Sequence, residues 1–359
     1  MFKKLILICT TLALLMPVAA TQAASKKSHK RVASSATAKK YSINASKYKL
    51  AAKYSKAGTA SSASPRASSR KKVHIARSGG KYYIQQANFA HSAPLDSFDG
   101  SGDLELASSK AMIVDQSNGE VLFAKNTNTP TPIASVTKLM TAMVMLDAKL
   151  PMDEILEISD ADVDYLKGTS SRLTVGTHLS RTELLQLAIM ASENRAAHAL
   201  GGNYPGGINA FIAAMNKKAA VLGLVNTRFV DPTGLNSDNQ STAEDLVKMV
   251  HVAYQYPEIR EASTTPSHQV WVNGRDYPVS FNNTNVLVRN GDINWTIGLS
   301  KTGYISEAGR CLVMQAEISG KSMIIVLLDS VGKNTRIGDA QRIRKWLEFT
   351  ASNTKLKSS

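Results

Sequence analysis

The sequence predicts an α/β (α+β) domain in which an antiparallel sheet is covered by helices and carries an inserted helical subdomain. Strand-like segments occur at both ends of the expected folded region, whereas helical spacing of apolar residues dominates from about 150 to 260. A chain that starts with strands, continues with helices and returns to strands favours one sheet built from both ends.

The first strands flank a hairpin signature, because apolar segments at 111–114 and 121–124 enclose the turn-forming residues Gln116 to Gly119. Folded structure is therefore expected from about Leu104. The later elements share clear apolar patterns: strands at 295–299, 311–318 and 323–328, and a closing helix from about 339 to 349.

A helix is expected to begin near Ser135, just after Pro132. Its apolar residues recur at roughly helical spacing, at Val136, Leu139, Met140, Met143, Val144 and Leu146. Such a helix would hold Ser135 rigidly.

Residues 1–23 are expected to form a signal peptide, since two lysines precede the apolar run Leu5 to Met16 and small residues up to Ala23 offer a cleavage site. The run is too short to span a bilayer comfortably, so we expect a product that is soluble after cleavage and periplasmic or otherwise extracytoplasmic. Cleavage would leave Cys311 as the remaining cysteine, so the mature chain could not form an internal disulfide. Cys311 is interpreted as a buried thiol.

Residues 24–95 are expected to be a flexible tether, followed by a catalytic domain over 96–355. The tether holds sixteen of the 43 Lys and Arg residues and no Asp or Glu, which leaves 25 basic and 28 acidic residues in 96–359. A segment this poor in apolar residues buries too little surface to offset its ordering entropy. It is either a solvated linker or an electrostatic attachment to an anionic envelope polymer; an export signal argues against nucleic acid.

Ser135 and Lys138 are separated by three positions, which places a hydroxyl and an amine on one face of a helical turn. A serine hydroxyl becomes a strong nucleophile when a neighbouring base takes its proton, and a desolvated lysine can be that base. The spacing alone proves little, because it recurs elsewhere in the chain.

Ser192 and Asn194 follow an apolar helical run, where the hydroxyl could relay a proton and the amide could bind Lys138 and a substrate carbonyl. A helix cap is the alternative reading. Ser237 to Asn239 repeats the Ser-x-Asn pattern in an expected loop and is the main competitor.

Lys301, Thr302 and Gly303 close the expected strand at 295–300. An ammonium and a hydroxyl at a strand edge could bind a substrate carboxylate, and a glycine allows close approach of the ligand to the backbone. By itself the tripeptide could equally be a turn.

Together, Ser-x-x-Lys, Ser-x-Asn and Lys-Thr-Gly in this order form the signature of penicillin-binding proteins and class A β-lactamases. Four segments sharpen the resemblance: 132–142, 192–197, 229–235 and 301–304. Over about 104–350 the chain resembles the D-alanyl-D-alanine endopeptidases of the penicillin-binding protein 7 type, within the low-molecular-mass D-Ala-D-Ala carboxypeptidase family.

The resemblance implies a serine hydrolase of the cell wall, active on peptidoglycan peptides, acylated by β-lactams and tied to cell shape. Ser135 would be the nucleophile, Lys138 the proton acceptor, and Ser192 with Asn194 the relay and substrate-binding pair. The remaining implied groups hold substrate: the side chains of Lys301 and Thr302 for its carboxylate, and backbone N–H groups of Ser135 and Tyr304 for the oxyanion. Glu193 is expected to point away from the chemistry.

No zinc-binding or phosphate-binding motif occurs, so no metal or cofactor is implied. The alternatives are a D-Ala-D-Ala carboxypeptidase, a serine β-lactamase and a non-catalytic wall-binding protein. A class A β-lactamase needs a glutamate that activates the deacylating water, and the stretch from Phe229 to Asn236 offers Asp231 instead. The 56 residues after Gly303 leave little room for a further domain or a stable membrane anchor, which favours the endopeptidase.

Overall fold

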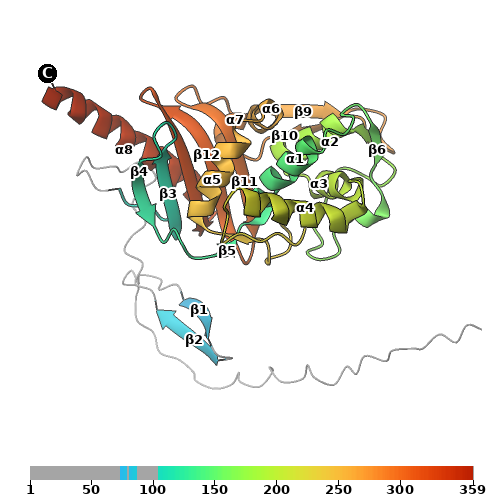
Figure 1. The fold of residues 1–359 in the computed structure, drawn as a ribbon, viewed down its shortest axis with the longest axis horizontal. Coiled ribbons are helices and arrows are strands. Elements are labelled where there is room, and N and C mark those ends of the chain that lie inside the picture. The colour runs from blue at the N-terminus through green and yellow to red at the C-terminus, as the bar shows by residue number, and fades with distance from the viewer. Residues whose placement is uncertain (1–72, 79–80, 87–103, 359) are drawn as a thin grey trace, which may run out of the picture. The chain divides into compact units, whose positions relative to one another are not determined.

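The computed structural model describes residues 73–78, 81–86 and 104–358 of the 359-residue chain (Figure 1). The expected signal peptide and most of the expected tether lie outside these residues. None of the helices in the described ranges is both long and apolar enough to cross a membrane.

The described residues of the expected tether form a hairpin that the sequence analysis did not identify. Strands β1 (Val73–Ser78) and β2 (Lys81–Gln86) pair antiparallel, with Ile75 opposite Ile84. Both segments contain β-branched or aromatic residues, which favour extended backbone. The surrounding Lys, Ser and Ala residues masked this short signal in the composition.

The central sheet has five antiparallel strands in the order β11-β12-β13-β3-β4 (Figure 1). Their bounds are β3 (Lys110–Asp115), β4 (Val121–Lys125), β11 (Thr296–Ile305), β12 (Gly309–Ile318) and β13 (Lys321–Ser330). The pairing of β13 with β3 joins strands from the two ends of the domain. The predicted fold class, with one sheet built from both ends, is confirmed.

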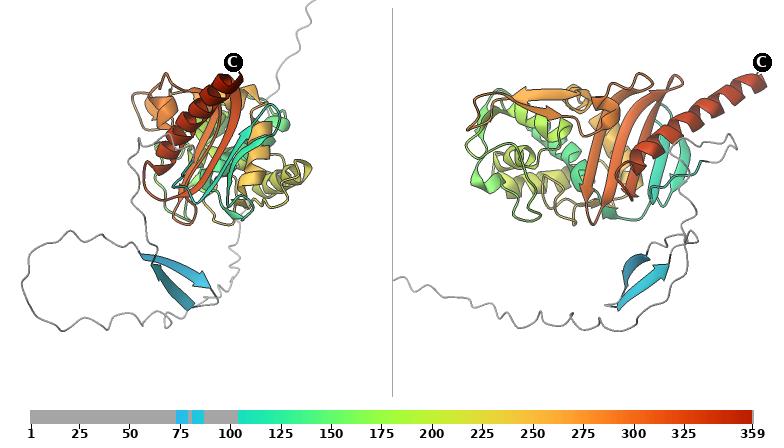
Figure 2. Two further views of the ribbon diagram at one scale, coloured as in Figure 1. Left: turned by 90° about the vertical axis from the view of Figure 1, so that its left-hand side faces the viewer. Right: turned by 180° about the vertical axis from the view of Figure 1, so that it is seen from behind.

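Both faces of the sheet are buried. Side chains alternate between the two faces along the central strands, and apolar residues point to each face. In β13, Ile324 and Val326 join the core beneath the helical part, whereas Ile325 and Leu327 join a second core with Ile343. Ile343 belongs to α8 (Thr335–Ser358), which packs on β12 and β13 (Figure 2). The opposite face is covered by α5 (Ala243–Ala253).

The inserted part is mainly helical, as expected. Its longer helices are α1 (Lys138–Asp147), α2 (Arg181–Met190), α3 (Asn194–Gly202), α4 (Gly207–Val221) and α6 (Pro257–Thr264). Short elements complete the described part of the chain: β5 (Thr131–Pro132), η1 (Ala134–Thr137), β6 (Ile155–Glu157), η2 (Asp160–Asp162), β7 (His178–Ser180), β8 (Gln240–Ser241), β9 (Ser267–Val270), β10 (Val279–Asn282) and α7 (Val286–Arg289).

Two local expectations need correction. The helix expected from Ser135 begins as the 3₁₀ turn η1, and α1 starts at Lys138. Lys301 to Gly303 do not close a strand but lie inside β11, which continues to Ile305 because β12 supplies pairing partners along its whole length.

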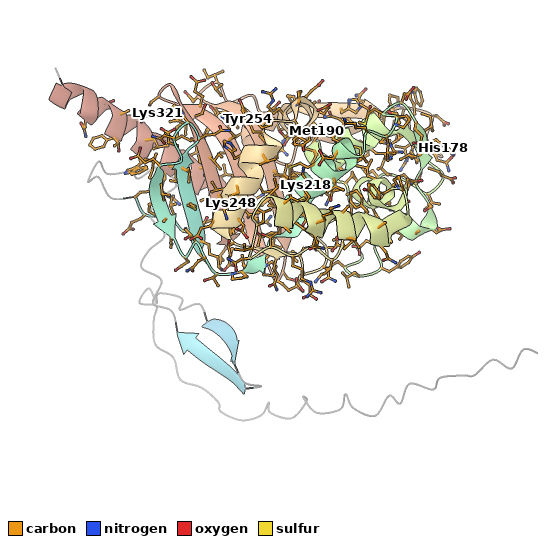
Figure 3. The ribbon with its side chains drawn as sticks, in the orientation of Figure 1. His178, Met190, Lys218, Lys248, Tyr254 and Lys321 are labelled. Atoms are coloured by element: carbon orange, nitrogen blue, oxygen red, sulfur yellow. The ribbon has the colours of Figure 1, made fainter. Side chains whose placement is uncertain are left out.

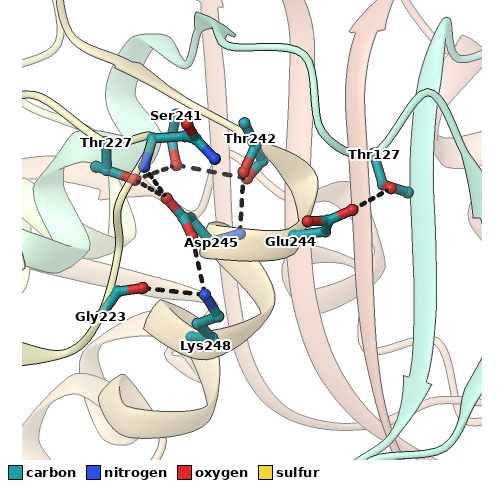
Figure 4. A network of polar contacts seen from close by, with 9 residues as sticks. Thr127, Gly223, Thr227, Ser241, Thr242, Glu244, Asp245 and Lys248 are labelled. Atoms are coloured by element: carbon teal, nitrogen blue, oxygen red, sulfur yellow. Dashed lines mark hydrogen bonds and ion pairs between the residues drawn. The ribbon is translucent and has the colours of Figure 1, made fainter.

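A polar network fixes the start of α5 and the loop before it (Figure 4). Thr242 Oγ1 accepts the Asp245 N–H at 3.2 Å and caps the helix. The buried Asp245 carboxylate accepts from Asn226 N at 2.8 Å and from Thr227 Oγ1 at 2.9 Å. Glu244 accepts from Thr127 Oγ1 at 2.6 Å. These bonds anchor both ends of the segment 226–242, which reaches the candidate site.

Candidate active site

Ser135 and Lys138 lie together where η1 passes into α1. Lys138 Nζ is 2.9 Å from Ser135 Oγ, 2.8 Å from Asn194 Oδ1 and 2.7 Å from the Thr233 carbonyl oxygen. The Lys138 side chain is fully buried. Three segments that are distant in sequence therefore converge on one amine.

Burial lowers the pKa of Lys138 to about 7, against the opposing charges of Asp231 and Glu193. A neutral amine has two N–H donors and one lone pair. The Asn194 and Thr233 oxygens can only accept, so they take the two donors and leave the lone pair facing Ser135. This is the arrangement that a general base needs beside a serine nucleophile.

Ser192 lies in the turn between α2, which ends at Met190 (Figure 3), and α3. Its φ of +61° is in the left-handed region, which is uncommon for serine and is often found at functional sites. Lys301 Nζ donates to Ser192 Oγ at 2.9 Å. Burial lowers the pKa of Lys301 well below its usual value, and the charges of Lys138 and Arg336 lower it further.

Strand β11 brings the remaining predicted residues beside the Ser135 turn. A Cβ added to Gly303 would lie 3.0 Å from Ser135 N, so the two backbones nearly touch. Thr302 Oγ1 donates to Thr284 Oγ1 at 2.7 Å. The Tyr304 side chain is 56% exposed, with the Arg310 guanidinium 4.4 Å from its ring centroid.

The loop at 231–236 contributes residues that the motif spacing did not identify. The Asp231 carboxylate accepts from the backbone N–H groups of Thr233 at 2.6 Å, Gly234 at 2.7 Å and Asn236 at 3.0 Å. This turn aims the Thr233 carbonyl at Lys138. The sequence Asp-Pro-Thr-Gly is rich in turn-forming residues, and this composition could have indicated the turn.

Gly234 makes the closest approach in this loop. Its φ is +81°, and an added Cβ would lie 1.9 Å from the carbonyl oxygen of Ala134. Ala134 itself has a φ of +48°. The residue before Ser135 therefore lies tightly between Gly234 on one side and Gly303 on the other.

The two Ser-x-Asn candidates have different surroundings. Asn194 and Ser192 contact the two buried lysines, whereas Asn239 is buried in the loop and bonds Val230 N and Asp231 O. The geometry thus favours Ser192 over Ser237. Glu193 accepts from Ser171 Oγ at 2.7 Å, and burial raises its pKa.

Two other reactive side chains lie outside this cluster. His198 Nδ1 is 2.7 Å from Asp162 Oδ1, which is a structural pairing between α3 and η2. Cys311 is buried, and burial raises the pKa of its thiol to about 11. A thiol in this state is a poor nucleophile.

A pocket of about 260 Å³ opens beside the amine-binding groups. Its lining includes Asn194 and Thr233, both partners of Lys138, and Tyr165 and Leu166 at its exposed edge. The pocket adjoins the cluster and can admit part of a peptide substrate.

Comparison with known proteins agrees with this geometry. Residues 96–332 match the model of the D-alanyl-D-alanine carboxypeptidase family, peptidase S11. The D-alanyl-D-alanine endopeptidase of Pseudomonas aeruginosa is 50% identical over 68% of this chain and 78% of that protein. The Escherichia coli enzyme of the same name is 47% identical over the same shares. The crystal structure of the Streptomyces K15 DD-transpeptidase has a TM-score of 0.62 and 30% identity, covering 67% of this chain and 97% of that one.

Replacing Gly234 by alanine is expected to lower the free energy of unfolding by about 3 kcal/mol, because the residue has positive φ and its Cβ would collide with Ala134 O. Urea denaturation followed by circular dichroism measures the change. Gly202→Ala is the matched control, since a Cβ on Gly202 meets nothing within 4 Å. Equal midpoints for the two variants would contradict the close approach.

Proposed function

The chain belongs to the D-alanyl-D-alanine carboxypeptidase family of serine peptidases, and on this premise we propose that it hydrolyses D-alanyl cross-links in peptidoglycan through an acyl-enzyme on Ser135. The observation that carries the proposal is the buried Lys138 amine, 2.9 Å from the Ser135 hydroxyl and with its pKa lowered to about 7. The 50% identity to an enzyme named as an endopeptidase supports the cross-link as substrate.

In the first half of the reaction, Lys138 accepts the Ser135 proton as Oγ attacks the D-alanyl carbonyl carbon. The C–N bond then breaks, and Lys138 gives up this proton, which passes through Ser192 to the leaving amine; Ser192 itself is held by Lys301. In the second half, Lys138 accepts a proton from the water that attacks the ester, and it returns the proton to Ser135 Oγ as the ester C–O bond breaks, which regenerates the serine.

The substrate is held by groups on β11, on α3 and in the Ser135 turn. Lys301 and Thr302 bind a carboxylate, and Asn194 binds a peptide carbonyl. The N–H groups of Ser135 and Tyr304 form the oxyanion hole, where one donor typically contributes about 10² to 10³ in rate. The contact between Gly303 and the Ser135 backbone supports this pairing of N–H groups.

A β-lactam would acylate Ser135 by the same attack. The loop at 229–236 carries no glutamate to activate a deacylating water, so the β-lactam ester persists. This separates the protein from a class A β-lactamase. A fully buried lysine beside a serine separates it from a non-catalytic wall-binding protein, which needs no activated nucleophile.

The proposal extends to the N-terminal part of the chain. Residues 1–23 would direct export to the periplasm, and the basic residues of 24–95 would attach the enzyme to an anionic envelope polymer. Cutting cross-links there would affect cell shape.

The rate of acylation by a fluorescent penicillin is expected to rise about tenfold per pH unit below pH 7 and to level off above it, because protonated Lys138 cannot accept the Ser135 proton. Gel fluorescence at timed intervals from pH 5 to 9 measures the rate. A rate that keeps rising up to pH 9 would show that the pKa of Lys138 is not lowered to about 7. Ser135→Ala should give no covalent adduct at any pH.

Cross-linked muropeptide dimers should be converted to monomers faster than pentapeptides release D-alanine. Both substrates are offered side by side to the full chain, and the products are separated by chromatography, with Ser135→Ala as the blank. Faster release of D-alanine would identify a carboxypeptidase and leave the acyl-serine mechanism intact.

Deleting 24–95 should weaken sedimentation of the protein with purified cell walls at low salt, because the segment carries sixteen basic residues and no acidic ones. Added salt should have the same effect on the full chain, whereas activity on small peptides should stay within about twofold. Equal sedimentation of both proteins at every salt concentration would reduce the segment to a linker.

A further inference from the structure

The Asn194 side chain bonds two groups that lie on opposite sides of its amide. Its Oδ1 accepts from Lys138 Nζ at 2.8 Å, and its Nδ2 donates to Thr169 Oγ1 at 3.0 Å. Rotation of the amide by 180° would place an N–H donor against the Lys138 amine. The function of Lys138 therefore depends on what holds this amide in one orientation.

Thr169 is held in turn by Asp164. Asp164 Oδ2 accepts from Thr169 Oγ1 at 2.6 Å and from Thr169 N at 2.9 Å, and its Oδ1 accepts from the N–H groups of Leu166 and Lys167 at 2.8 and 2.9 Å. Burial raises the pKa of Asp164, but the bonds from Thr169, Lys167 and Leu166 outweigh burial and lower the pKa overall. Near neutral pH the side chain is an ionised carboxylate, which can only accept.

The Asp164 carboxylate sets the direction of each hydrogen bond between it and Lys138. Because Asp164 only accepts, the Thr169 hydroxyl must donate to it, and the Thr169 oxygen is free to accept. The Asn194 NH₂ group donates to that oxygen, so the Asn194 oxygen faces Lys138. Lys138 donates to it and keeps its lone pair for Ser135.

We propose that Asp164 and Thr169 are positioning residues, which fix the orientation of the Asn194 amide and thereby hold Lys138 as an acceptor for the Ser135 proton. The inference rests on the proposed acyl-serine mechanism. Neither residue belongs to the Ser-x-x-Lys, Ser-x-Asn or Lys-Thr-Gly motifs.

The amide orientation affects the protonation of Lys138 as well as its geometry. The charges of Asp231 and Glu193 raise the pKa of this amine, and the charge of Lys138 in turn lowers the pKa of the neighbouring Lys301. An acceptor oxygen from Asn194 also favours the ammonium form, whereas an N–H group in its place disfavours it. Loss of the bond to Thr169 therefore allows the Asn194 amide to rotate, which lowers the apparent pKa of acylation and slows the reaction.

The test compares acylation by a fluorescent penicillin in full-length Thr169→Val, Thr169→Ser and Thr174→Val across pH 5 to 9. Thr169→Val should lower the plateau rate about tenfold and move the midpoint about one pH unit lower, the size expected for one net hydrogen bond. Thr169→Ser keeps the hydroxyl and should stay within about threefold of the original rate. Thr174→Val is the matched control, because Thr174 Oγ1 donates to Asn273 O and lies outside this chain of contacts.

Asp164→Asn provides a second variant. An amide in place of the carboxylate offers one acceptor oxygen instead of two, so Thr169 is no longer forced to donate, and the same downward shift of the midpoint is expected. A slower rate with an unchanged midpoint in both variants would reduce the segment to a structural support and overturn the proposal. Absence of any adduct in the original protein would instead overturn the acyl-serine mechanism on which it rests.

Discussion

The burial of the Lys138 amine is the constraint on which the rest of the site depends. An ammonium removed from water is costly, and the group responds by losing its proton near neutral pH. The neutral amine still needs partners for its N–H groups, and these come from α3 and from the loop before β8. The turn at Ser135, the start of α3 and the loop before β8 are thus held at the spacing that satisfies one nitrogen atom.

The second buried lysine is subject to the same constraint. Lys301 lies on β11 and donates to Ser192, which belongs to the helical part. Burial and the charge of Lys138 both lower the pKa of Lys301, so the pair avoids holding two full charges in a low-dielectric interior. An anion placed beside Lys301 would raise its pKa again, because an opposite charge favours the ammonium form.

The sequence alone predicts those elements and site residues that are encoded by the spacing of nearby residues. The three motifs, the strand pair at 111–124 and the helix after Pro132 could be predicted, because spacing and periodicity encode them within short windows. The Thr233 carbonyl and the close approach of Gly234 to Ala134 could not, since backbone groups carry no residue signature and contacts between distant segments have no period. The hydroxyl of Thr169 was missed for the same reason: its importance lies in one hydrogen bond across 25 positions of sequence.

The topology of the sheet also decides when the protein can become active as it folds. Ala111 of β3 pairs with Leu327 of β13, so the central strand pair forms after nearly all of the domain has been made. Contacts of such long range make folding slow and leave the strand edges open until late. β11, which carries Lys301, reaches β3 through β12 and β13, and it therefore joins Ser135 when the sheet closes. A partly synthesised chain lacks the second half of its site, so hydrolytic activity is coupled to completion of the fold.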